Sequence, residues 1–152
     1  MSSGAEKTIE YELGRAPADV AALADVCHDE RNVAAGPASG TFLTEGMVVA
    51  PCSMRTLSAI ANSANDNLIV RAADVCLKER RRLVLVVRET PLHVGHLRLM
   101  TQAAEAGAVI LPPVPAFYHR PRSVEELIDH TVTKILDQFG IHLDLIRRWE
   151  GI

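Results

Sequence analysis

Three short apolar runs interrupt an otherwise mixed pattern of hydrophobic and polar positions. They cover residues 46–52, 82–89 and 107–113, are rich in Val, Ile and Leu, and are bounded by turn residues or charges. A strand that is covered on both faces of a sheet shows such an unbroken run, whereas a half-exposed strand alternates. The pattern therefore predicts three buried, parallel strands.

The segments between these runs have the period of amphipathic helices. Apolar residues recur at helical spacing in 54–66, 67–81 and 92–107, and Gly107 stands where a helix C′ residue is expected. A last helix is predicted from Ser123 as N-cap to Gly140, with Glu126 completing a capping box. Nearer the N-terminus, residues 16–32 resemble a short helix, and residues 8–14 fit a strand or a helix equally well.

The predicted order is strand, helix, helix, strand, helix, strand, loop, helix. Right-handed crossovers make this an α/β fold of flavodoxin or Rossmann type, with an open parallel sheet and helices on both faces. No linker, repeat or low-complexity tract divides residues 1–152, so we expect a single domain. Such a domain normally opens with a strand and a glycine-rich phosphate turn. None precedes residue 46, and we expect the first βα unit to be missing.

The amino-acid composition argues against several classes of function. The net charge of −3 gives no reason to expect a nucleic-acid partner, and the basic run at 78–82 is expected to be a solvated helix end. Three cysteines without a CxxC pair indicate neither a disulfide framework nor a zinc site. No apolar run reaches the roughly 20 residues of a membrane span, and no signal-peptide core is present. We expect a cytoplasmic protein.

Polar residues follow each predicted strand, at the sheet edge where ligands bind in such folds. After the first strand, Ser53, Arg55 and Thr56 offer hydroxyls and a cation at a helix N-terminus, which favours an anion. An ordinary N-cap at Ser53 and an exposed Arg55 explain the same pattern equally well. After the second strand come Arg88 and Glu89, and Glu89 is the clearest acid–base candidate.

The third strand is followed by a proline-stiffened loop that carries Tyr118 near the same edge. Lys134, in the helix beyond it, adds a cation. His93 and His96 lie three apart without an evident third ligand, so no metal site is expected. Cys52 ends an apolar run and is expected to be packed rather than nucleophilic.

Four motifs together resemble the UbiX flavin prenyltransferase family, formerly described as 3-octaprenyl-4-hydroxybenzoate carboxy-lyases. They are P-C-S-M-R-T (51–56), R-A-A-D-V-C-L-K-E-R (71–80), V-R-E-T-P-L-H (87–93) and P-A-F-Y-H-R-P (115–121), within a resemblance that extends from about Ser2 to Phe139. The resemblance implies a flavodoxin-like fold, a homo-oligomer of twelve subunits, and no metal. It also implies transfer of a dimethylallyl group from dimethylallyl monophosphate to N5 and C6 of reduced FMN. The prenylated FMN would serve a UbiD-type decarboxylase, in ubiquinone synthesis or aromatic acid decarboxylation.

The resemblance also assigns expected roles to residues. The FMN-binding residues would be Ser2, Ser53, Met54, Arg55, Thr56 and Arg88. The prenyl phosphate would be bound by Tyr118, Lys134, Arg71 and Lys78, the last two across a subunit interface. Glu89 and Glu12 would be the active-site acids. The cations and the phenol would stabilise the departing phosphate, and Glu89 would help to move protons at the flavin.

One departure from the family pattern leaves an alternative open. The family begins with a strand and a flavin-phosphate loop of the form Gly-Ala/Ser-Ser-Gly, which this sequence does not contain, and Ser2 stands beside the amino terminus. A non-catalytic or impaired FMN-binding or assembly subunit related to UbiX is therefore the second hypothesis. A direct aromatic acid decarboxylase is the third, and no group of residues supports it.

Overall fold

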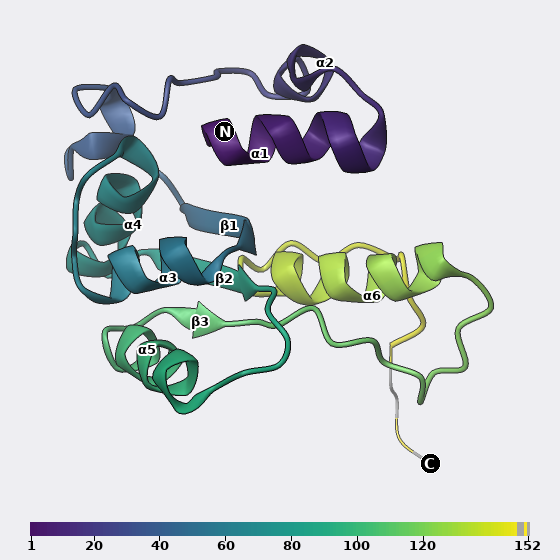
Figure 1. The fold of residues 1–152 in the computed structure, drawn as a ribbon. Helices are drawn as coiled ribbons and strands as arrows, with labels where there is room; N and C mark the ends of the chain where they lie inside the picture. Colours follow the sequence, from purple (N-terminus) through teal and green to yellow (C-terminus); the bar gives the residue numbers. More distant parts are fainter. Residues whose placement is uncertain (149–150, 152) are drawn as a thin grey trace.

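The computed structural model describes residues 1–148 and 151, and these form an α/β fold around a small parallel sheet (Figure 1). The strands are β1 (Gly46–Cys52), β2 (Arg82–Val87) and β3 (Val109–Ile110), in the spatial order β1-β2-β3. Both pairings are parallel. The register of β1 against β2 shifts between Val49 and Cys52, where Pro51 has no N–H to donate. The predicted parallel sheet is confirmed.

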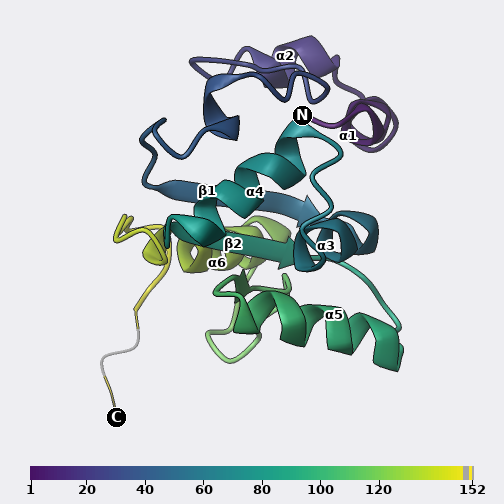
Figure 2. The ribbon, with the colours of Figure 1, turned by 90° about the vertical axis from the view of Figure 1, so that its left-hand side faces the viewer.

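Four helices follow or connect these strands. They are α3 (Met54–Ala61) and α4 (Leu68–Lys78) between β1 and β2, α5 (Val94–Glu105) between β2 and β3, and α6 (Val124–Asp137) after the loop. Figures 1 and 2 place α3 and α4 on one side of the sheet and α6 on the other. Helices thus lie on both faces, and the predicted element order from residue 46 onward is confirmed.

Side-chain caps explain where these helices begin. The N-cap side chains of Ser53, Asn67, His93 and Ser123 each accept a backbone N–H from the first turn that follows. Gly107 has a φ of 111° directly after the C-cap of α5, as predicted. The predicted capping box is only half formed, because the Glu126 carboxylate accepts from the N–H of Arg122 instead of from Ser123.

The segment before β1 has no buried residue and consists of short helices joined by turns and irregular structure. It contains α1 (Ser3–Thr8), a π-helical turn η1 (Ile9–Leu13), α2 (Pro17–Ala21) and the 3₁₀ turn η2 (Gly36–Ala38). Residues 9–13 are thus helical, and α2 is much shorter than the predicted 16–32. Glu30 ties this segment to the fold, because its carboxylate accepts from Ser3 N–H and its carbonyl from Leu68 N–H.

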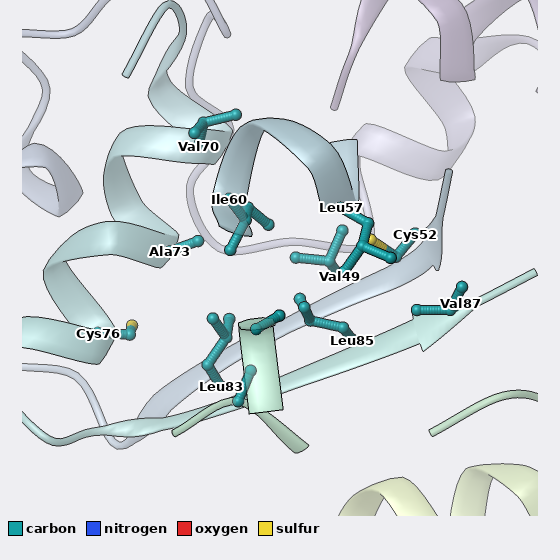
Figure 3. Packing of buried hydrophobic residues seen from close by; sticks show 12 residues of the cluster. Val49, Cys52, Leu57, Ile60, Val70, Ala73, Cys76, Leu83, Leu85 and Val87 are labelled. Carbon is teal, nitrogen blue, oxygen red and sulfur yellow. The ribbon is translucent and has the colours of Figure 1, made fainter. Parts of the chain in front are cut away.

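The hydrophobic core lies between the sheet and helices α3 and α4 (Figure 3). Its buried members are Val49, Cys52, Leu57, Ile60, Val70, Ala73, Cys76, Leu83, Leu85, Val87, Ala103 and Ala108. β2 is buried at every position from Leu83 to Val87, as a strand covered on both faces should be.

Two predictions about the outer strands are wrong in detail. β1 is not covered on both faces. Val48 is 38% exposed and Ala50 is exposed, because these residues alternate with the buried Val49 along the strand and the core packs against the Val49 side. The third strand is two residues long rather than seven. Pro112 and Pro113, which lack N–H groups, end its pairing soon after Leu111 donates to the carbonyl of Leu85.

Candidate functional site

The junction between β1 and α3 forms one half of the candidate site. Ser53 stands between the two elements as the N-cap, and its Oγ accepts the N–H of Thr56 at 3.2 Å and lies 3.1 Å from Thr56 Oγ1. The first amides of α3 have no intrahelical carbonyl to bond, and the helix dipole places partial positive charge there. The junction therefore presents N–H and O–H donors suited to an anion.

The end of β2 lies directly beside this junction. The N–H of Arg88 donates to the carbonyl of Cys52 at 3.3 Å, which joins the two strand ends. In the structure as described, the exposed side chains of Arg55 and Arg88 form no recorded hydrogen bond or ion pair. One carboxylate oxygen of Glu89 accepts from Thr90 N–H, and the side chain is otherwise open to solvent. Two cations without a partner among the described residues, and one acid, thus come from the chain segments next to the Ser53 donors.

Tyr118 and Lys134 come from the loop after β3 and from α6. The Tyr118 hydroxyl lies 3.0 Å from Nε2 of His130, which precedes Lys134 by one helical turn. His130 is buried, and desolvation, with contributions from His119 and the positive charge of Lys134, lowers its pKa. His130 is therefore neutral at pH 7.

Among the described residues, neither Tyr118 and Lys134 nor the remaining predicted residues form a hydrogen bond or ion pair with the Ser53 junction. Arg71 donates from Nε to the carbonyl of Ala38 and pairs with Asp74 at 3.3 Å. Lys78 pairs with Glu79 and lines a cavity of about 1060 Å³ at the amino ends of β1 and β2. Seven strand residues, at about 3.3 Å each, separate that end from Ser53 by about 20 Å.

The two N-terminal candidates lie in the exposed helical segment. Ser2 is the N-cap of α1, and its Oγ accepts the N–H of Ala5 at 3.1 Å. Glu12 is exposed on η1.

Two expectations about reactive groups can be compared with the structure. Cys52 is buried, and burial raises the pKa of its thiol to about 12, which confirms a packed rather than a nucleophilic residue. His93 is the N-cap of α5, and its ring lies against that of His96, tilted by 35° with the centroids 3.6 Å apart. Among the described residues, no group of three or more His, Cys, Asp or Glu side chains is arranged to hold a metal ion.

His130 is the residue that the sequence analysis missed. A polar residue on the buried face of a helix could have indicated it: His130 and Thr133, three residues later, are the buried residues of α6. Its bond to Tyr118 spans twelve residues and a loop, which helical periodicity does not reveal.

Comparisons with known proteins identify the family. The sequence model of the Flavoprotein family matches residues 6–136. The chain is 59% identical over 151 residues to the flavin prenyltransferase UbiX of Thauera aromatica, covering 99% of this chain and 78% of the relative. It is 61% identical over 153 residues to the same enzyme of Escherichia coli K12, covering 99% and 81%. The chain belongs to the UbiX flavin prenyltransferase family.

Solved structures of UbiX proteins have the same fold. AnUbiX (PadA1), crystallised in complex with FMN and dimethylallyl pyrophosphate, superposes with a TM-score of 0.97 at 53% identity, over 100% of this chain and 81% of that one. A dodecameric FMN-dependent UbiX-like decarboxylase from Escherichia coli O157:H7 gives 0.95 at 48% identity, over 99% and 82%. The flavodoxin-like fold and the UbiX resemblance inferred from the motifs are therefore confirmed.

Proposed function

We propose that this protein is a flavin prenyltransferase. It transfers the dimethylallyl group of dimethylallyl monophosphate to reduced FMN, and the prenylated FMN serves a UbiD-type decarboxylase. The observation that carries this proposal is the bond from Arg88 N–H to the Cys52 carbonyl. It joins the strand ends from which a helix N-terminus, two hydroxyls and two guanidinium groups without a partner among the described residues arise, and this is the donor set that a flavin phosphate needs.

The FMN would be held mainly by this edge. The contacts that we propose come from Ser53, Met54, Arg55, Thr56 and Arg88, with Ser2 as a further contact. The Ser53 and Ser2 oxygens already accept helix N–H groups, so both side chains are pre-oriented. Ser2 retains its O–H for the ligand, and the hydroxyl pair of Ser53 and Thr56, in which one hydroxyl donates to the other, retains one O–H. Orientation before binding reduces the entropy that FMN binding costs.

The prenyl phosphate would be bound by Tyr118 and Lys134. Negative charge grows on the phosphate as its bond to the allyl carbon breaks, and a phenol O–H together with an ammonium group stabilises that charge. Glu89 has one carboxylate oxygen free of the backbone and would move protons at the flavin edge. Glu12 is the second acid that we propose.

Arg71 and Lys78 would complete the site of a neighbouring subunit. Within one chain, Lys78 lies at the opposite end of the strands from Ser53, so a role at the phosphate requires a second copy. Tyr11, Leu23 and Leu43 are each more than 80% exposed, and exposed apolar residues of this size favour subunit contacts. We propose a homo-oligomer, of twelve subunits by analogy with the dodecameric relative.

We place the protein in the cytoplasm. All three cysteines are free thiols, which fits a reducing compartment. Within the described residues, no helix has the length and apolar character needed to cross a bilayer.

The test is an anaerobic incubation of the purified protein with reduced FMN and dimethylallyl monophosphate, followed by mass spectrometry of the flavin. Prenylated FMN supports the proposal. FMN binding without product would instead indicate an impaired FMN-binding or assembly subunit. A protein that causes no change in the flavin spectrum at millimolar FMN would contradict both hypotheses.

A further inference from the structure

The tip of Tyr118 is held by a buried histidine. Tyr118 itself is 73% exposed, whereas His130 is only 9% exposed, and Tyr118 Oη lies 3.0 Å from His130 Nε2. We propose that His130 is a positioning residue, which orients the Tyr118 hydroxyl so that its proton faces the prenyl phosphate. The inference rests on the proposed function, and it adds a residue that acts through Tyr118 rather than on the substrate.

The chemistry of the ligand fixes the direction of this hydrogen bond. The oxygens of an ionised phosphate ester accept hydrogen bonds, so Tyr118 must donate its O–H to the ligand. The Tyr118 oxygen then accepts from His130, which requires the tautomer with the proton on Nε2. If His130 were the acceptor, it would take the hydroxyl proton, and Tyr118 would present only lone pairs to an anion.

The surroundings of His130 favour this arrangement. Its ring lies parallel to that of His119, at an interplanar angle of 7° with centroids 5.0 Å apart, and meets the Tyr118 ring edge-on at 85°. The lowered pKa of His130 keeps the imidazole neutral, so only one of its two nitrogens carries a proton. The two neighbouring rings fix the plane in which that proton points.

Both ring nitrogens of His119 are buried without a hydrogen-bond partner in the described structure. Neither nitrogen therefore bonds the Tyr118 hydroxyl, whose hydrogen-bond partner is His130. His119 contacts both rings without a hydrogen bond, and the polar interaction that orients Tyr118 is the one with His130.

The test compares H130F, H130Q and Y118F by steady-state kinetics with reduced FMN. H130F keeps a planar ring but removes the donor, and we expect it to raise the KM for dimethylallyl monophosphate about tenfold while the Kd for FMN is unchanged. Glutamine retains an N–H donor at a similar reach, so H130Q should return the KM to within about threefold of the wild type. The double variant Y118F/H130F should raise the KM for dimethylallyl monophosphate no further than Y118F does, because His130 acts only through Tyr118.

His142→Gln is the matched control, because this exposed histidine bonds Asp137 and, within the described part of the chain, takes no part in the ring contacts of Tyr118, His119 and His130. It should leave the KM unchanged. Equal KM values for H130F and wild type would overturn the inference, as would an H130Q variant as impaired as H130F. Circular dichroism of each variant shows whether it is folded.

A measurement without substrate separates this inference from the proposed function. Nitrogen-15 NMR of the wild-type imidazole should show the proton of His130 on Nε2, with a signal that Y118F shifts and His142→Gln does not. A proton on Nδ1 would overturn the inference even in an active enzyme. If the wild type forms no prenylated FMN, the proposed function fails, whereas the tautomer still reports whether His130 orients Tyr118.

Discussion

Substitution of Arg88 should change FMN binding without changing the stability of the fold, because its side chain has no hydrogen-bond or ion-pair partner in the described structure. Its contribution to the fold is the backbone N–H that donates to the Cys52 carbonyl, and any residue except proline retains that bond. Arg88→Gln should therefore change the free energy of unfolding by no more than about 0.5 kcal/mol. A charge-assisted hydrogen bond contributes about 1.5–3 kcal/mol, so its loss should weaken FMN binding by about 10- to 150-fold.

The assay is a titration of the protein with FMN, followed by quenching of flavin fluorescence at about 0.15 M ionic strength, where distant surface charges are largely screened. Arg98→Gln is the matched control, since Arg98 is an exposed arginine on α5 that also has no recorded partner. Equal FMN affinity for the two variants would refute the proposed phosphate contact. A fall of several degrees in the Tm of Arg88→Gln alone would show that the guanidinium is structural.

Three further predictions concern the core and the titratable groups. Leu85→Ala, at a position that is 0% exposed on β2, should lower the free energy of unfolding by about 2–5 kcal/mol in urea denaturation, and a change below about 1 kcal/mol would contradict the assigned core. Because burial raises the pKa of Cys52 to about 12, iodoacetamide at pH 8 should alkylate the exposed Cys27 and spare Cys52 until the protein unfolds, as peptide mass spectrometry can show. Hydrogen bonds from Arg148 lower the pKa of Asp137 below its usual value of about 3.9, so this stabilisation is complete above that pH and is lost as the pH falls. Asp137→Asn should flatten the fall of Tm below about pH 4, and an unchanged profile would contradict the pairing.

The burial of the central strand β2 on both faces was predictable, because every residue from Leu83 to Val87 is apolar. Positions 83–87 are all apolar and all buried, so the unbroken run correctly indicated cover on both faces. The same kind of run misled at β1. Val48 and Ala50 are as apolar as their neighbours, yet both are exposed. Their exposure depends on which elements pack against β1, and the sequence of a single strand does not show that.

The candidate site was predictable where it depends on strand ends. Parallel strands bring their carboxyl ends to one edge, and the backbone bond from Arg88 to Cys52, the residue before Ser53, shows that the ends of β1 and β2 meet there. The partner of Tyr118 was not predictable in this way. The loop between β3 and α6 determines which face of α6 the Tyr118 phenol reaches. In the sequence, His130 fits the pattern of an amphipathic helix and has no feature that marks it as the partner of Tyr118.

The proposed role of Lys78 at the prenyl phosphate requires a division of the active site between subunits. The donors that we assign to FMN lie at the carboxyl ends of β1 and β2 in one chain, whereas Lys78 lies at the amino ends, about 20 Å away. Binding of FMN should therefore persist in a dissociated subunit, but stabilisation of the departing phosphate should require assembly. Activity per subunit should then fall on dilution below the dissociation constant of the oligomer while FMN remains bound, and Lys78→Gln should lower activity at every dilution. Constant activity per subunit across dissociation, measured with size-exclusion chromatography in parallel, would show that one chain contains the whole site.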